Sequence, residues 1–430
     1  MPQKQHVDVV VIGAGISGVS AACHLSERCP NKSFTVLEAR ESMGGTWDLF
    51  RYPGIRSDSD MQTFSYNFRP WTQPKTITEG HEIRGYIEDT ARYYGVDKNI
   101  QFGHKVISAA YDSDECEWTL KVQSKNANGR KTTKTMSCNF LWGCSGFYNY
   151  EEGYTPEFKG REDFKGPIIH PQHWPEDLDY SGKKVVVIGS GATAVTLIPS
   201  MADKTAHITM LQRSPGYIFS IPKIDPVSKL AQKVLPAKAV AHSSRIRNAA
   251  LMLGIHKFSR LQPKVLNRIV LTQMKLQLGR NVDMKNFTPN YDVWDERLCA
   301  VPDGDLFKVL REGKASVVTD HIERFTETGI LLKSGKALEA DIIVTATGLN
   351  LQIGSGIDFK IDGHAHKIGD SFGYKGVLMS DMPNFALTMG YTNVSWTLKA
   401  DLTSQYVCRV LNYMDKKGAT QCVVRVPQKG

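Results

Sequence analysis

The chain has 430 residues, of which 41% are apolar and 23% are charged, and its formal net charge is +9 at pH 7. This length predicts two or three domains with large cores, and the composition excludes a disordered chain, a collagen and a coiled coil. An integral membrane protein is also excluded, because no run reaches the roughly 18 uninterrupted apolar residues that a spanning helix needs.

The positive charge does not indicate a nucleic acid partner, because the basic residues form no tight block and no nucleic-acid-binding module is recognisable. No secretory signal precedes the first strand-like run, and the eight cysteines include no CxxC pair. We therefore expect free thiols in a cytoplasmic protein. The histidines show no metal-ligand spacing at a credible site, so no metal is predicted.

Residues 7–12 (VDVVVI) form a nearly continuous apolar run, which is typical of a strand buried on both faces of a parallel sheet. The turn Gly13-Ala-Gly15-Ile-Ser-Gly18 follows, then a helix at 19–25 and a strand at 34–37 that ends at Glu38. Such a turn lets backbone N–H groups approach a pyrophosphate at a helix N-terminus. A carboxylate at Glu38 can accept hydrogen bonds from ribose hydroxyls, so we expect FAD or NAD here; the alternative is a solvated acid at a strand end.

The same order recurs 176 residues later, with a strand at 184–188 and the turn Gly189-Ser190-Gly191-Ala192-Thr193-Ala194. A helix is predicted at 195–202, and a second strand at 207–211 is followed by Arg213 and Ser214. Arg213 stands where an NAD site carries an acid, and a guanidinium can hold the 2′-phosphate of NADP. The second unit therefore favours NADPH; the alternative is that Arg213 is a surface charge.

Together, the two units predict an α/β fold with two Rossmann-like dinucleotide-binding domains. The expected boundaries are 1–150 and 336–430 for the FAD-binding domain, 151–180 for a linker, and 181–335 for the NADP-binding domain. A basic helical insertion is expected at about 225–285. We interpret it as packed on the second domain; a membrane-surface helix is the alternative, so a weak peripheral membrane contact stays open. A loop and a closing helix are expected at 391–413.

A flavin site followed by an NADPH site implies hydride transfer to the flavin. Disulfide reductases need a redox-active cysteine pair, which is absent, so oxygen is the expected electron acceptor.

Two long motifs carry a resemblance to a known family. Residues 164–175 follow the pattern FxGxxxHxxxWP, which Phe164, Gly166, His170, Trp174 and Pro175 satisfy just before the second glycine turn. Residues 44–58 follow GGxWxxxxYPGxxxD. Both motifs resemble those of type I Baeyer–Villiger monooxygenases. Segments such as GGTWDLFRYPGIRSDSDM are most similar to the subgroup of the mycobacterial monooxygenase that activates ethionamide.

This resemblance implies FAD and NADPH as cofactors and O₂ as oxidant. It also implies a C4a-peroxyflavin that converts a hydrophobic ketone to an ester or lactone and oxidises sulfides or thioamides as well. Family members usually continue for some tens of residues past the closing helix, whereas this sequence stops at Gly430. The resemblance therefore implies that part of the substrate-pocket wall, or a tail that contacts NADP, is missing, whether the chain is a shortened form or a short variant.

The resemblance also assigns site residues. Arg297 corresponds to the family's active-site arginine, whose fixed charge suits an oxyanion, and Asp58 is expected to pair with it. The alternative for Arg297 is a loop ion pair with Asp295 or Glu296. His170 is implied to be a hinge residue rather than a base. The expected cofactor contacts are Gly13, Gly15, Ser17, Gly18, Glu38, Gly45, Thr46, Trp47, Asp48, Leu49, Arg56, Ser57, Asp58, Val106, Gly189, Ser190, Gly191, Ala192, Thr193, Ala194, Val195, Arg213 and Ser214.

Two other functions remain open from the sequence. One is a flavin-containing monooxygenase that acts mainly on nitrogen or sulfur nucleophiles. The other is an NADP-sensing regulator with an inactive flavin site, which Glu38, Asp58 and Arg297 argue against. Neither the natural substrate nor the oligomeric state can be predicted.

Overall fold

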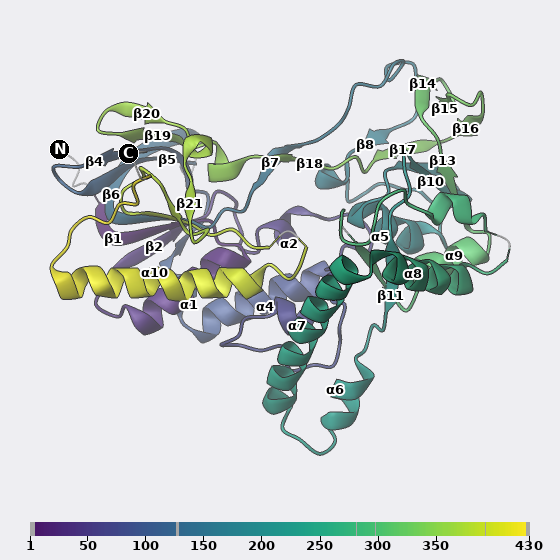
Figure 1. Ribbon diagram of the computed structural model, residues 1–430. Helices are drawn as coiled ribbons and strands as arrows, with labels where there is room; N and C mark the ends of the chain where they lie inside the picture. Colours follow the sequence, from purple (N-terminus) through teal and green to yellow (C-terminus); the bar gives the residue numbers. More distant parts are fainter. Residues whose placement is uncertain (1–4, 126–128, 281, 297, 392, 427–430) are drawn as a thin grey trace.

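The computed structural model describes residues 5–125, 129–280, 282–296, 298–391 and 393–426, which form two lobes and a protruding helical arm (Figure 1). The first lobe is built on a sheet in the order β20-β19-β4-β5-β6-β1-β2-β3, with β21, β22 and β23 attached beside β6. Its strands are β1 (Gln5–Ile12), β2 (Phe34–Leu37), β3 (Ile100–Gln101), β4 (Lys105–Asp112), β5 (Glu117–Lys125), β6 (Lys131–Gly143), β19 (Asp358–Ile361), β20 (His364–His366), β21 (Gly373–Tyr374), β22 (Leu378–Met379) and β23 (Phe385–Leu387).

Strand β1 is parallel to both β2 and β6, and its residues Val9, Val10 and Val11 are fully buried. The apolar run at 7–12 therefore forms the central buried strand that its composition predicts. Helix α1 follows at once and packs beside the closing helix α10 (Figure 1). The helices of this lobe are α1 (Ile16–Arg28), α2 (Thr46–Leu49), α3 (Met61–Phe64), α4 (Gly80–Tyr93) and α10 (Thr397–Lys417).

The second lobe contains a parallel sheet in the order β13-β10-β9-β17-β8. Its elements are β8 (Ile168–Ile169), β9 (Lys184–Ile188), α5 (Ala192–Met201), β10 (His207–Gln212), α9 (Asp305–Arg311), β13 (Ala315–Thr319) and β17 (Ile342–Thr345). Two smaller sheets complete this lobe. One pairs β11 (Ile218–Ile221) with β12 (Cys299–Pro302), and the other contains β14 (Ile322–Thr326), β15 (Gly329–Leu332) and β16 (Ala337–Glu339). In each lobe a glycine turn joins the central strand to a helix, which confirms the predicted fold class.

One predicted domain boundary is wrong. The expected first domain included everything after residue 336, but β17 pairs with β9, so the second sheet extends through Thr345. Strand β8, expected in the linker, pairs with β17 as well. The chain returns to the first lobe along β18 (Leu349–Leu351), which pairs antiparallel with β7 (Tyr148–Gly153). These two strands form a ribbon that joins the lobes, called the connecting ribbon below (Figure 1).

The expected helical insertion is present as α6 (Pro226–Ala231), α7 (Ala237–Leu261) and α8 (Pro263–Leu278). These three helices, within residues 222–280, are called the helical arm below. Helix α8 packs against α9 and β11, whereas α7 reaches across to α3 of the first lobe. Within the described residues, no helix combines the length and the apolarity required to cross a bilayer.

Candidate active site

A cavity of about 1530 Å³ lies where the lobes and the helical arm meet. Its walls come from the first glycine turn, the segment 55–60, the start of α5, helix α7 and the loop before α10. Its volume exceeds the roughly 300–1,000 Å³ that one drug-sized ligand occupies, so it has room for more than one molecule. Both predicted dinucleotide units therefore contribute to a single space.

The first glycine turn presents bare backbone to this cavity. Gly13 has a φ of +98°, and a Cβ on it would lie 2.9 Å from the Cα of Ser145. Gly15 and Gly45 are the N-cap residues of α1 and α2, neither cap has a side-chain hydrogen bond, and a Cβ on Gly45 would lie 3.1 Å from the Cα of Gly15. Two helix N-termini thus converge on side-chain-free backbone, which fits a pyrophosphate group.

Glu38 lies beside this turn and is not a solvated acid. Its side chain is 6% exposed and lines the cavity. Its carboxylate accepts hydrogen bonds from the backbone N–H of Ala14 at 2.6 Å and of Arg40 at 2.9 Å. Burial raises the pKa of Glu38, and these two hydrogen bonds only partly oppose that effect. The carboxylate is therefore fixed at the end of β2, within reach of a ligand in the cavity.

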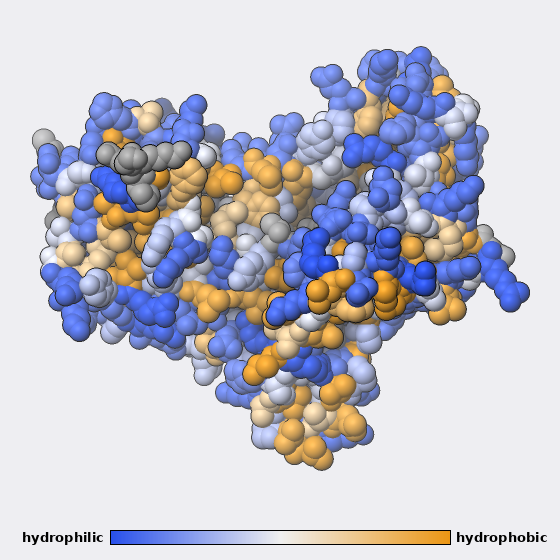
Figure 2. Space-filling model, viewed as in Figure 1, coloured by the Kyte–Doolittle hydropathy of each residue, from blue (hydrophilic) through white to orange (hydrophobic). Residues whose placement is uncertain are grey.

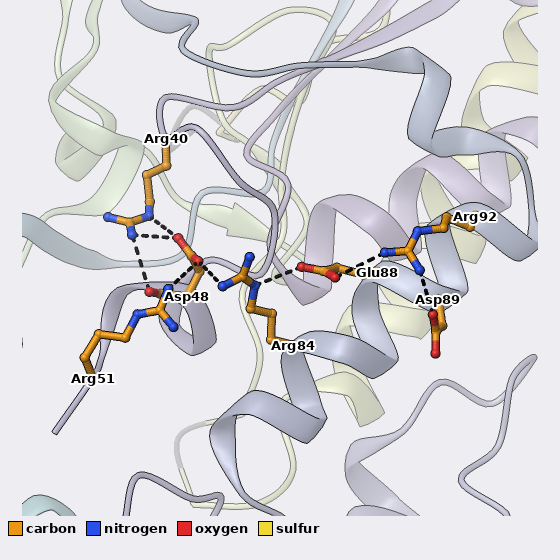
Figure 3. Close-up of polar contacts among 7 residues, drawn as sticks. All are labelled: Arg40, Asp48, Arg51, Arg84, Glu88, Asp89 and Arg92. Carbon is orange, nitrogen blue, oxygen red and sulfur yellow. Dashed lines mark hydrogen bonds and ion pairs between the residues drawn. The ribbon is translucent and has the colours of Figure 1, made fainter. Parts of the chain in front are cut away.

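Asp48 and Leu49, two of the predicted cofactor contacts, do not line the cavity. The Asp48 side chain is 2% exposed and forms ion pairs with Arg40 at 2.6 Å, Arg51 at 3.0 Å and Arg84 at 3.0 Å (Figure 3). Burial would raise the pKa of Asp48, but hydrogen bonds from Ser42 and Arg40 and the nearby guanidinium charges lower it overall. This carboxylate fixes α2 near the turn, while Thr46 and Trp47 of the same helix face the cavity.

The second glycine turn is more open. A Cβ on Gly189 would lie 2.3 Å from the carbonyl oxygen of Ala346, so the turn packs closely on the residue after β17. Ala192 and Thr193 reach the cavity wall, whereas Ala194 and Val195 are buried in the helix packing. Arg213 and Ser214 are exposed at the end of β10, where the hydroxyl of Ser190 donates to the Ser214 carbonyl at 3.4 Å.

The segment after the Tyr-Pro-Gly motif connects the two lobes. Arg56 lines the cavity and pairs with Asp305, at the start of α9, at 2.6 Å. Ser57 is buried, and its hydroxyl donates to the carbonyl of Ser59. Asp58 and Val106 also line the cavity. Arg297, the predicted catalytic arginine, lies outside the described residues, so its pairing with Asp58 stays a prediction.

The residues of the FxGxxxHxxxWP motif pack on the connecting ribbon. The His170 ring lies against Gly153, where a Cβ would be 2.0 Å from the ring. His170 Nε2 donates to the carbonyl of Gly348 at 3.0 Å, and its Nδ1 accepts from the N–H of Gln172 at 3.2 Å. The side chains of Gln172 and His173 bond carbonyls of β7. His170 therefore contacts β7 and the residue just before β18.

The other motif residues serve the same packing. Phe164 and Trp174 are buried, and a Cβ on Gly166 would lie 2.2 Å from the carbonyl of Asp341, just before β17. Pro175 accepts a hydrogen bond from the backbone of Leu178. None of these four residues lines the cavity.

Sequence reasoning missed several cavity residues. Trp396 lines the cavity and donates from its indole nitrogen to the hydroxyl of Ser17 at 2.8 Å. Tyr150 lies against Gly45, and burial raises the pKa of its phenol to about 12. These contacts join segments that lie more than 100 residues apart, and no local motif marks them.

Sequence reasoning also missed Arg245 of α7, which contacts the backbone of the first lobe. It is 8% exposed and donates to the backbone carbonyls of Gln62, Thr63 and Ser65, at 3.3, 2.9 and 2.7 Å. Because Thr63 lines the cavity, this guanidinium attaches the helical arm directly to the cavity wall of the first lobe. A lone Arg on an amphipathic helix gives no sequence signal for such a contact.

Three relatives found by comparison with known proteins are all described as flavin-dependent monooxygenases. Residues 6–416 match the family model described as flavin-binding monooxygenase-like. The chain is 54% identical, over 98% of its length and 86% of the relative, to the FAD-containing monooxygenase EthA of Mycobacterium tuberculosis. It is 54% identical, over 99% of its length and 86% of the relative, to the putative FAD-containing monooxygenase MymA of the same species. It is 53% identical, over 98% of its length and 84% of the relative, to a probable FAD-binding monooxygenase AlmA of an Acinetobacter species.

Solved structures share the fold. A steroid monooxygenase bound to NADP aligns with a TM-score of 0.79 and 24% identity, over 97% of this chain and 87% of that one. A cyclohexanone monooxygenase aligns with a TM-score of 0.78 and 22% identity, over 97% of this chain and 89% of that one. At this identity the structural likeness concerns the two-lobed architecture.

Proposed function

The chain belongs to the flavin-binding monooxygenase-like family, and from this premise we propose that it is an NADPH- and O₂-dependent Baeyer–Villiger monooxygenase. Its proposed substrates are hydrophobic ketones, which it converts to esters or lactones, and it also oxidises sulfides or thioamides. Family membership confirms the predicted flavin monooxygenase class. The substrate and the chemistry of oxygen insertion are our proposal.

The observation that carries this proposal is the cavity, which is lined by the first glycine turn, by Ala192 and Thr193 of the second, and by the segment 55–60. The first turn and Glu38 would hold the FAD pyrophosphate and ribose, and Arg213 and Ser214 would bind the 2′-phosphate of NADPH. A solved structure that shares the fold is a complex with FAD and NADP, which supports this assignment. When bound, the flavin supplies the hydride acceptor and the site of oxygen activation.

The chain's own residues would then exclude water and hold charge. Aromatic side chains of Trp47, Phe147 and Trp396 line the cavity. A wall that excludes water would suppress the release of H₂O₂ in place of product. Asp58 would orient Arg297, whose planar guanidinium suits an oxyanion that develops on the substrate. This arrangement would polarise the ketone without any proton transfer from His170, whose two ring nitrogens are occupied at the connecting ribbon.

Product identification tests the proposal. The purified protein would be given NADPH, ¹⁸O₂, and a ketone and a sulfide in the same reaction, and the products would be identified by mass spectrometry. We expect one ¹⁸O atom in an ester or lactone and one in a sulfoxide. Labelled sulfoxide without labelled ester would instead establish the alternative, a monooxygenase that acts on heteroatoms. Oxygen consumption without any labelled product would contradict both.

A further inference from the structure

The helical arm ends in a surface that is unusually apolar for an exposed region. We define the apolar tip as residues 224–239, which comprise α6, the turn after it and the start of α7. Val234 is 82% exposed, Leu230 67% and Val227 59%, and Ile224 and Leu235 are about half exposed. Figure 2 shows these hydrophobic side chains gathered on the protruding end of the molecule. Contiguous exposed aliphatic residues of this kind mark an interaction site.

The apolar tip is also basic. Lys229, Lys233 and Lys238 are exposed, and among the described residues none of them forms an ion pair. The tip's single acid, Asp225, is buried and bonded to Arg247 and Ser228. Residues 222–280 carry twelve Lys and Arg and one acid, so the rest of the chain is close to neutral. The net charge of +9 is therefore concentrated in the helical arm.

The apolar tip adjoins the cavity. Pro226, the first residue of α6, lines the cavity, while Val227 and Leu230 of the same helix are exposed. Leu251 and Leu253 of α7 also line the cavity, although each is more than half exposed. The apolar tip therefore borders the cavity at Pro226, where the ion-paired Asp225 and Arg247 also line the wall.

We propose that the apolar tip docks on an anionic lipid surface. Aliphatic side chains that enter the interface, together with lysines that pair with lipid phosphates, are the two attractions that hold an amphipathic helix on such a membrane. A second copy of the chain is a poor occupant, because two strongly positive surfaces would face each other without compensating acids. Docking would place the cavity wall next to the bilayer, which dissolves the hydrophobic substrates proposed above. Only that consequence rests on the proposed function; lipid binding does not.

Co-sedimentation with vesicles tests this docking. The full chain would be mixed with phosphatidylcholine vesicles with or without phosphatidylglycerol, and the bound fraction measured. We expect binding to the anionic vesicles and its loss as added salt shortens the Debye length. The variant K229Q/K233Q/K238Q should bind on the order of 100-fold more weakly, since each cation near the surface contributes about fivefold. The variant L230S/V234S should lose about tenfold or more per side chain.

Matched controls separate docking from general effects of charge and hydropathy. K333Q/K336Q/K360Q removes three exposed lysines outside the arm, and L402S/V426S removes two exposed aliphatic residues elsewhere. Both should bind vesicles like the parent chain. Equal binding by the tip variants and the controls, or no binding to anionic vesicles at low salt, would overturn the proposal. So would sedimentation velocity that shows a dimer which only L230S/V234S dissociates, because the tip would then be an interface between copies.

Discussion

The two glycine turns stand in the same order of strand, turn, helix and strand, but their surroundings differ. The first is enclosed: Ala14 and Ser17 are buried, and Glu38 at the end of β2 is 6% exposed. The second is open: Gly191, Arg213 and Ser214 are all exposed. A buried cradle suits a group that stays bound through many cycles, whereas an exposed one suits a ligand that must bind and leave in every cycle. The contrast therefore supports the proposal that the first turn binds the prosthetic flavin and the second the diffusing nicotinamide.

The largest expected effect tests this contrast at equivalent glycines. A Cβ on Gly15 would lie 3.5 Å from Gly45, which is ordinary contact, so Gly15→Val should fold but fill the space for the pyrophosphate. We expect purified Gly15→Val without flavin absorbance. A Cβ on Gly191 would meet nothing within 4 Å, and Gly191→Val should keep its flavin while its KM for NADPH rises. Full flavin occupancy in Gly15→Val would contradict the assignment.

The second prediction separates reduction from oxygenation. Removing one fixed donor to a developing anion typically costs about 10²–10³ in rate. Arg297→Ala should keep FAD and accept hydride from NADPH, but release H₂O₂ in place of ester. Arg297→Lys should not restore ester formation, because an ammonium lacks the planar fork of donors. Stopped-flow absorbance would follow reduction, and chromatography would follow product. Ester formation near the parent rate in Arg297→Ala would place the catalytic arginine elsewhere.

Sequence patterns predicted the parts of this molecule that are encoded locally. A β-rich run, a glycine turn and a helix follow one another within 25 residues, so β1, α1 and the position of Glu38 could be predicted. The direction of the Asp48 side chain could not, because it depends on Arg84 in α4. The boundary at 336 was wrong because the partner of β17 is β9, more than 150 residues earlier.

The third prediction concerns the open turn. Losing a charge-assisted contact with a 2′-phosphate costs roughly 1.5–3 kcal/mol. Arg213→Ala should therefore raise the KM for NADPH about tenfold or more and leave the use of NADH nearly unchanged. Arg324→Ala, which removes an exposed arginine that pairs with Asp163, is a matched control. Steady-state kinetics with both nicotinamides would check the result, and equal weakening for the two would remove Arg213 from the 2′-phosphate site.

The smallest expected effect lies at the connecting ribbon between the two turns. His170 donates from Nε2 to Gly348 and accepts at Nδ1 from Gln172, which requires a neutral ring. Burial lowers the pKa of His170 below its ordinary value of 6.5, and the bond to Gly348 only partly opposes this. Because the folded chain binds the proton more weakly than the unfolded chain, the stability that His170 contributes is present above pH 6.5 and is lost as pH falls through the lowered pKa.

His170→Ala should therefore be less stable than the parent at neutral pH by about 1 kcal/mol for each hydrogen bond lost. This difference should shrink as the pH falls below 6.5, the ordinary pKa of the ring. Denaturant unfolding of both proteins across the pH range would measure it, with His364→Ala, an exposed histidine of β20, as the control. A difference that grows toward acid would show that the ring is charged at the connecting ribbon. The bond from Gln172 to Nδ1 would then be wrongly assigned.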